Sequence, residues 1–216
     1  MTFEHVYDIL QQDVNYKKLL KPILKYLSKD KLILDAGCGS GYILSMLALD
    51  GYEIEGIDNN QMMLDLAKDR LESLNLNVNL INHDLRKPLP NKYDQIISLL
   101  DVSHYFMGVK NLYHNYFKAL NPGGRLILDL YKAKVNEDES GSYDDLSYRW
   151  KVRTSKTQII HKIDVEYLNE KSSFKVRQYY KPLDEYLNTL KEVGFKVKTI
   201  SSFDDRKVFV ICQKEK

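Results

Sequence analysis

The sequence predicts an α/β fold built on a doubly wound, mostly parallel sheet of seven strands. Three observations support this prediction. Short apolar runs such as residues 32–34 lack helical spacing, which suits strands buried on both faces. These runs alternate with segments whose apolar residues recur at helical spacing, as in parallel βαβ units. Only the polar turn at residues 204–206 separates the last two runs, so these two strands should form an antiparallel hairpin.

Residues that favour turns and helix caps mark the ends of these elements. Asn60 is placed to cap a helix, residues 121–124 read Asn-Pro-Gly-Gly, and Gly194 ends the last helix. Pro22 predicts a break or kink in the N-terminal helical segment. We expect strands over residues 31–36, 53–57, 77–81, 93–100, 125–130, 195–200 and 207–212, and helices within 3–27, 41–49, 60–71, 109–120 and 182–193.

A different pattern separates the fifth strand from the last helix. Residues 147–180 alternate polar and apolar side chains, and residues 169–172 have turn composition, which predicts two or three antiparallel strands. An insertion at this point should rise over the carboxyl ends of the parallel strands, where open α/β sheets bind ligands. We therefore expect one domain over residues 1–216, with an inserted antiparallel β lid over residues 139–181.

Composition excludes several classes of protein. The chain has 32 Lys and Arg against 30 Asp and Glu, a net charge of +2, which does not suit a dedicated nucleic-acid binder. Its apolar runs are far shorter than the ~18 residues of a membrane span. The N-terminus lacks a signal-peptide pattern, and the only two cysteines lack metal-ligand spacing. We expect a cytoplasmic protein that binds neither DNA nor membranes; the sequence does not indicate its oligomeric state.

The most informative segment is residues 34–41, Leu-Asp-Ala-Gly-Cys-Gly-Ser-Gly, which follows the first strand. Its glycines let the chain turn tightly and let a ligand approach the backbone closely. Asp58 ends the next strand, where a carboxylate can accept both hydroxyl protons of a ribose. Tyr42 stands where a dinucleotide site has its third glycine, so the dinucleotide pattern fails. Asp35 would repel phosphate but suits an ammonium or sulfonium group, as in S-adenosylmethionine.

These residues resemble the first motif of the class I S-adenosylmethionine-dependent methyltransferases, and the C-terminal hairpin is shared with that family. The resemblance extends along nearly the whole chain to the bacterial small-molecule methyltransferase-like subgroup, which carries an inserted antiparallel sheet. It implies a Rossmann-like methyltransferase fold, S-adenosylmethionine as cofactor and a small-molecule acceptor methylated on nitrogen or oxygen. The cofactor-binding residues expected from the motifs and the resemblance are Tyr16, Asp35, Gly37, Gly39, Asp58, Asn59, Met63, Asp84, Leu85 and Leu100.

The predicted acceptor side begins where the fourth strand ends. Residues 100–105, Leu-Asp-Val-Ser-His-Tyr, resemble the Leu-Asp-Ser-x-Asn-Tyr motif of the subgroup. The intrinsic pKa of histidine suits a general base, so His104 is the predicted catalytic base, and Tyr105 is predicted to orient the acceptor. The chain departs from the subgroup at His104, where Asn is frequent, and at Phe174, where a His often precedes the Arg-x-Tyr motif. These departures concern the acceptor and leave the cofactor site intact.

Alternative functions differ in what they require of the chain. DNA base methylation calls for an Asn/Asp-Pro-Pro-Tyr/Phe motif or a Pro-Cys nucleophile, and the sequence has neither. RNA or protein acceptors stay open, since residues 146–181 hold nine Lys and Arg against three Asp and Glu. A non-catalytic S-adenosylmethionine binder also stays open. A nicotinamide oxidoreductase is disfavoured by the glycine spacing and by the terminal hairpin.

Overall fold

The computed structural model describes residues 1–215 and contains the predicted seven-stranded sheet. Its strand order is β10-β11-β5-β4-β1-β2-β3. The first five strands of the chain pair in parallel, whereas β11 runs antiparallel to both β5 and β10. The strands are β1 (Ile33–Ala36), β2 (Ile54–Asp58), β3 (Leu80–Asn82), β4 (Tyr93–Ser98), β5 (Leu120–Tyr131), β10 (Lys196–Ser201) and β11 (Lys207–Gln213). The predicted hairpin is therefore confirmed.

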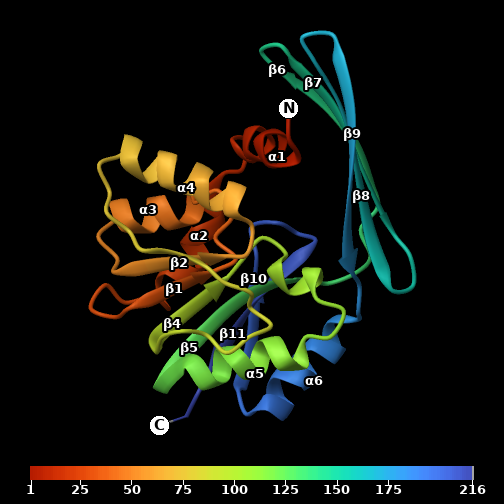
Figure 1. Cartoon of the computed structure of the whole chain (residues 1–216). Helices are drawn as coiled ribbons and strands as arrows, with labels where there is room; N and C mark the ends of the chain where they lie inside the picture. Colours follow the sequence, from red (N-terminus) through yellow and green to blue (C-terminus); the bar gives the residue numbers. More distant parts are fainter. Residues whose placement is uncertain (216) are drawn as a thin grey trace.

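Helices cover both faces of this sheet (Figure 1). On one face lie α5 (Lys110–Ala119) and α6 (Leu183–Val193), and on the other α2 (Tyr16–Leu24), α3 (Tyr42–Leu49) and α4 (Gln61–Ser73). Successive residues of β1 supply the two layers: Ile33 packs in the core beneath α2 and α3, and Leu34 in the core beneath α5 and α6. All four residues of β1 are buried, which explains why its sequence shows no alternation.

The N-terminal segment forms two helices, but the predicted break near Pro22 is wrong. Helix α1 (Phe3–Gln11) ends before Asp13, and α2 begins after Asn15, whose side chain accepts a hydrogen bond from the Lys18 N–H at 3.0 Å. This cap starts the new helix. Pro22 lies inside α2 near its end, where the missing proline N–H removes one intrahelical hydrogen bond.

Four strands, rather than the predicted two or three, form a second antiparallel sheet, here called the lid sheet. It comprises β6 (Glu137–Tyr143), β7 (Leu146–Thr154), β8 (Gln158–Tyr167) and β9 (Glu170–Tyr179), paired in that order. Strand β6 escaped prediction because its sequence, Glu-Asp-Glu-Ser-Gly-Ser-Tyr, lacks apolar alternation. The predicted turn over residues 169–172 is shifted: Leu168 and Asn169 adopt positive φ angles of 49° and 67°, and β9 starts at Glu170.

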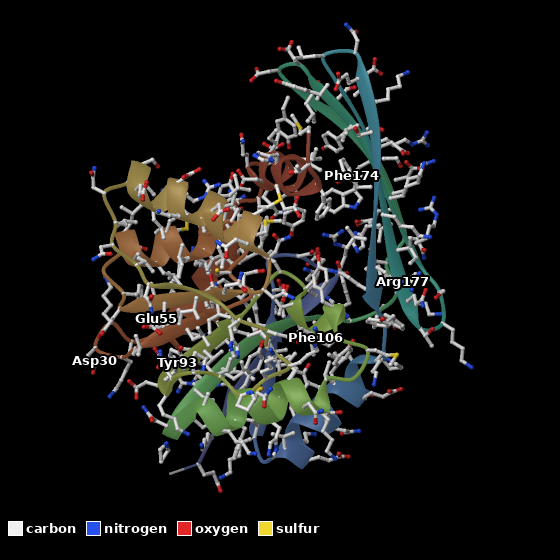
Figure 2. All side chains as sticks on the ribbon, viewed as in Figure 1. Asp30, Glu55, Tyr93, Phe106, Phe174 and Arg177 are labelled. Carbon is white, nitrogen blue, oxygen red and sulfur yellow. The ribbon has the colours of Figure 1, made fainter. Side chains whose placement is uncertain are left out.

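Helix α1 lies between the helices of the main domain and the lid sheet (Figure 1). Val6 and Leu10 of α1 are buried against Ile163 on the inner face of the lid sheet. Phe174, labelled in Figure 2, contributes to this contact through its ring, whose centroid lies 5.8 Å from that of Phe3. Position 174, where the subgroup often has His, thus holds an apolar contact that joins the lid sheet to α1. No helix within residues 1–215 combines the length and apolar content of a membrane span.

Candidate active site

A cavity of about 740 Å³ opens at the carboxyl ends of β1, β2 and β4. Because the strand order reverses between β1 and β4, the loops after these two strands diverge and leave a crevice there. All ten predicted cofactor-binding residues line this cavity, which we call the cofactor cavity. They come from five separate segments of the chain: Tyr16, then Asp35, Gly37 and Gly39, then Asp58, Asn59 and Met63, then Asp84 and Leu85, and finally Leu100.

The glycine loop follows β1 and shapes one wall of the cofactor cavity. Gly37 has φ +86°, and a Cβ built on it would lie 2.6 Å from a methyl carbon of Val102. Gly39 has φ +53°, and a Cβ there would meet no atom within 4 Å. Gly37 is therefore required by packing and backbone conformation, whereas Gly39 leaves its backbone open to a ligand in the cavity.

Asp58 stands at the end of β2 with its carboxylate across the glycine loop. Its Oδ2 accepts the Gly39 N–H at 3.0 Å, and its Oδ1 accepts the Asn60 N–H at 2.9 Å. Burial raises the pKa of Asp58, and these backbone donors oppose that rise. Each oxygen keeps lone-pair capacity for another donor. The carboxylate is thus oriented to accept the two hydroxyl groups of a ribose.

Asp35 lies deeper in the cofactor cavity and is only 3% exposed. Its Oδ2 has no hydrogen-bond partner among residues 1–215. Burial, and secondarily the charge of Asp58, raises the pKa of Asp35 to about 7. A buried carboxylate without a partner is costly unless a cationic group joins it. The ammonium of S-adenosylmethionine is such a group, so the residues of this structure fit the cofactor.

The far wall of the cofactor cavity combines apolar and acidic side chains. Leu85 and Met63 are buried and present apolar surface suited to an adenine ring. Asp84 lines the cavity, but both of its oxygens already accept hydrogen bonds from the Arg86 guanidinium. Arg86 lowers the pKa of Asp84 to about 2. An adenine amino group would therefore share this carboxylate with Arg86, a partner that the sequence analysis did not anticipate.

Tyr16 joins the N-terminal helices to the cofactor cavity. Its hydroxyl donates to Gln11 Oε1 at 3.1 Å, and its ring stacks on Tyr42 with centroids 5.0 Å apart. The Arg70 guanidinium covers Tyr42 at 3.4 Å and pairs with Asp8 of α1 at 2.8 Å. Tyr16 thus lines the cavity while its hydroxyl proton is engaged, so its role is to shape the wall rather than to move a proton.

A second cavity of about 660 Å³ lies between α1, the lid sheet and the carboxyl ends of β4 and β5. We call it the acceptor cavity. It meets the cofactor cavity along five residues that line both: Phe3, Tyr7, Gln11, Leu100 and Tyr105. The contact between α1 and the lid sheet that closes the acceptor cavity joins segments more than a hundred residues apart in sequence.

The backbone after β4 is strained where the two cavities meet. Leu100 and Asp101 have φ angles of 60° and 72°, a left-handed conformation that costs non-glycine residues energy. The Asp101 N–H donates to Asp129 Oδ1 at 3.1 Å, and the Tyr131 hydroxyl donates to Asp101 Oδ2 at 2.9 Å. Lys207 pairs with Asp101 at 2.7 Å. These contacts hold the strained turn and place the Asp101 carboxylate in the acceptor cavity.

The structure does not support His104 as the catalytic base. Its side chain is fully buried and lines neither cavity. The Tyr131 N–H donates to its Nε2 at 3.5 Å, so Nδ1 carries the proton and donates to the Tyr179 carbonyl at 3.0 Å. The Tyr186 hydroxyl also lies 3.2 Å from Nδ1. His104 therefore fastens the end of β9 to the short 3-10 helix η1 (Val102–Tyr105), a packing role that its loop position in the sequence did not reveal.

Tyr105 does lie at the site, as predicted, on the wall shared by the two cavities. Desolvation raises the pKa of Tyr105 to about 12, so its hydroxyl stays protonated near neutral pH. It can orient an acceptor by hydrogen bonding but is a poor base. Three residues that the sequence did not mark as site residues, Tyr7, Trp150 and Lys207, also line the acceptor cavity. Only the alternation of the inserted strands could have indicated Trp150.

This strand order, a carboxylate able to accept ribose hydroxyls at the end of β2 and a buried acid without a partner together indicate one class of enzyme. The family model described as a methyltransferase domain matches residues 33–124, which hold the glycine loop, Asp58, Asp84 and Leu100. The chain is a class I S-adenosylmethionine-dependent methyltransferase, and S-adenosylmethionine is its cofactor.

One curated relative and several solved structures resemble this chain over most of its length. YqeM of Bacillus subtilis (strain 168), named as a methyltransferase, is 26% identical over 217 residues, covering 93% of this chain and 87% of YqeM. The crystal structure of an S-adenosylmethionine-dependent methyltransferase from Clostridium acetobutylicum ATCC 824 superposes with a TM-score of 0.81 at 20% identity, covering 99% of this chain and 98% of that one. CalS10 from Micromonospora echinaspora, an amino pentose methyltransferase, has a TM-score of 0.78 at 16% identity, with 99% and 97% covered.

Proposed function

We propose that this methyltransferase acts on a small molecule, which it methylates on nitrogen or oxygen inside the acceptor cavity. The observation that carries the proposal is the junction of the two cavities at Leu100 and Tyr105. A volume of about 660 Å³, closed on one side by the lid sheet and α1, has the size of a small-molecule site. CalS10, an amino pentose methyltransferase, offers a precedent for such an acceptor on this fold.

The residues of the cofactor cavity divide the task of holding the cofactor. Asp58 would accept the ribose hydroxyls, Asp35 would pair with the ammonium group, and Leu85 with Met63 would enclose the adenine. When bound, S-adenosylmethionine supplies a methyl group on a positively charged sulfur. The protein's contribution is then to align the acceptor with that methyl and to exclude water. A base is needed only for an acceptor that arrives protonated.

Three side chains are placed to align the acceptor. Tyr105 presents a protonated hydroxyl on the shared wall, Asp101 presents a carboxylate held by Tyr131 and Lys207, and Tyr7 forms the wall contributed by α1. The lid sheet covers the acceptor cavity with residues of β7, β8 and β9. We assign residues 139–181 the role of a substrate lid within a single domain. The cytoplasm as the compartment of the protein stays a prediction from the sequence.

A pair of tryptophan substitutions on β9 tests the proposal. Val176 lines the acceptor cavity, whereas Lys175 is exposed on the opposite face of the lid sheet. Val176→Trp should abolish label transfer from methyl-labelled S-adenosylmethionine to a low-molecular-mass metabolite extract, while its cofactor affinity is retained. Lys175→Trp, the matched control, should keep both.

Label that enters RNA or protein fractions instead of the small-molecule fraction would contradict the proposal, as would full transfer by Val176→Trp. The cofactor affinity and the thermal melt of each variant establish that both proteins are folded. An RNA or protein acceptor predicts the reverse result. Val176→Trp should then retain label transfer, because neither macromolecule enters the acceptor cavity as a whole. Lys175→Trp should weaken it, because Lys175 lies on the outer face of the lid sheet.

A further inference from the structure

The acceptor cavity carries a charge opposite to that of the protein as a whole. Six carboxylate side chains and two basic side chains line it, a formal excess of four negative charges, whereas the chain has a net charge of +2. The acidic residues are Asp13, Asp101, Asp129, Glu137, Glu139 and Asp204, and the basic ones are Arg206 and Lys207. Charge of one sign in a cleft with low-dielectric walls focuses the electrostatic potential on its ligand.

Both basic side chains are already neutralised by neighbours. Lys207 is buried between Asp101 at 2.7 Å and Asp129 at 3.0 Å. Burial opposes its charge, but these two carboxylates raise the pKa of Lys207 well above its ordinary value. Arg206 pairs with Asp204 at 2.6 Å and also with Glu137. Each basic group thus forms ion pairs with two carboxylates, so neither basic group is free to bind an anionic acceptor.

The two remaining acids add to the negative potential. Asp13, between α1 and α2, accepts a hydrogen bond from the Tyr143 hydroxyl, and Glu139 lies on β6. Neither forms an ion pair within residues 1–215. Desolvation, and then the charge of Glu137, raises the pKa of Glu139, and the charge of Arg206 opposes this rise only in part. The remaining titratable ring, that of His161, does not supply a cation, since burial lowers its pKa.

Aromatic rings complete the walls between these acids. Tyr7 of α1 and Trp150 of β7 lie with ring centroids 6.5 Å apart, and Tyr143 stacks on Tyr148 at 5.8 Å. All four side chains line the acceptor cavity. The faces of such rings attract cations, and carboxylates combined with aromatic rings form the usual surroundings of bound ammonium groups.

We propose that the acceptor is an organic cation, a small amine that carries at least one ammonium group besides the nitrogen that is methylated. This inference rests on the proposed function and deepens it by naming the substrate class. In the reaction, the lone pair of the neutral amine nitrogen forms the new nitrogen–carbon bond. The methyl–sulfur bond breaks with its electron pair going to sulfur, and the methylated nitrogen then releases its proton to solvent. Phosphorylated and carboxylated acceptors are excluded by the same charges.

The chain offers a direct reporter of this cavity, because Trp150 is its only tryptophan. Spermidine is the cationic probe and a dicarboxylate of similar length is the anionic one, each titrated into protein saturated with S-adenosylhomocysteine. We expect spermidine to change the Trp150 emission saturably, with an affinity that falls as salt rises, and the dicarboxylate to leave it unchanged. The double variant Asp13→Asn with Glu139→Gln should weaken spermidine binding about tenfold, which corresponds to a loss of ~1.4 kcal/mol for the two carboxylates together.

A matched control is Glu166→Gln, which removes a carboxylate from β8 outside the cavity lining and should leave spermidine binding unchanged. Equal or tighter binding of the dicarboxylate, absence of saturable spermidine binding, or a double variant that binds like the parent would overturn the inference. Label transfer separates the two proposals. Amine binding without label in any small molecule refutes the proposed function alone, whereas label in a neutral or anionic small molecule refutes the amine assignment alone.

Discussion

The buried carboxyl of Asp35 should make the unfolding free energy of the cofactor-free protein depend on pH. Its pKa is raised from 3.8 to about 7, chiefly by burial. The unfolded chain therefore loses this proton near pH 4, while the native state retains it until about pH 7. Between these values the unfolded state binds fewer protons, so the free energy of unfolding falls as the pH rises.

The size of this effect follows from the shift. About three pKa units at ~1.36 kcal/mol each correspond to roughly 4 kcal/mol, lost progressively between about pH 4 and pH 7. Asp35→Asn cannot ionise, so this contribution is absent from its pH profile. The amide can change the absolute stability by a constant amount. Only the difference between the two pH slopes therefore reports on Asp35.

Urea denaturation of both proteins across this pH range measures that difference. We expect the parent to lose roughly 4 kcal/mol relative to Asp35→Asn between pH 4 and pH 8, and the variant to bind S-adenosylmethionine more weakly at pH 8. S-adenosylhomocysteine, which carries the same ammonium group, should flatten the profile of the parent. Parallel profiles for the two proteins, with unchanged cofactor affinity, would refute both the burial argument and the ammonium assignment.

Three further predictions concern single contacts. Asp58→Ala should weaken cofactor binding by roughly 1.5–3 kcal/mol for each ribose hydrogen bond lost, measured by calorimetry, with exposed Asp69→Ala as the control that keeps the parent affinity. Gly37→Ala should lower the free energy of unfolding by about 1–3 kcal/mol, because the new Cβ would lie 2.6 Å from a methyl carbon of Val102 on a backbone with positive φ. Gly108→Ala is the control, since a Cβ there meets open space and should change the urea midpoint little. Equal midpoints for the two variants would contradict the steric argument. Lys207→Met should cost about 3–5 kcal/mol in the same assay because two buried carboxylates lose their counterion, and a smaller loss would show that they protonate instead.

Local sequence patterns predicted the main sheet because each of its strands carries its own signal. The parallel strands are short apolar runs bounded by turn residues, and the terminal hairpin follows from a turn too short for any crossover. The signal failed where a tertiary contact decides the structure. Strand β6 is polar and acidic, and it becomes a strand because β7 pairs along its whole length. Pro22 looked like a helix breaker, but the Asn15 cap set the helix boundary.

The two sides of the active site differ in how far sequence reasoning reached. All ten predicted cofactor-binding residues line one cavity, since most follow directly from strand ends that parallel topology brings to one edge of the sheet. The acceptor side follows no such rule. Histidine is a frequent general base, but His104 is buried against Tyr186 and lies outside both cavities, because η1 directs its side chain into the core. Burial of a single side chain on a loop is not encoded in any local pattern.

The sequence by itself therefore determined the fold class and the cofactor, since these depend on a contiguous loop and on the ends of neighbouring strands. The residues expected to hold the cofactor line one cavity, and their roles stay a prediction. Only the tertiary structure decided the acceptor cavity. Its acids come from the segment after α1, from the turn after β4, from β5, from β6 and from the turn before β11, and no spacing in the chain relates these segments. Folding places them around one cavity, where charges of the same sign add to the electrostatic potential that acts on a ligand.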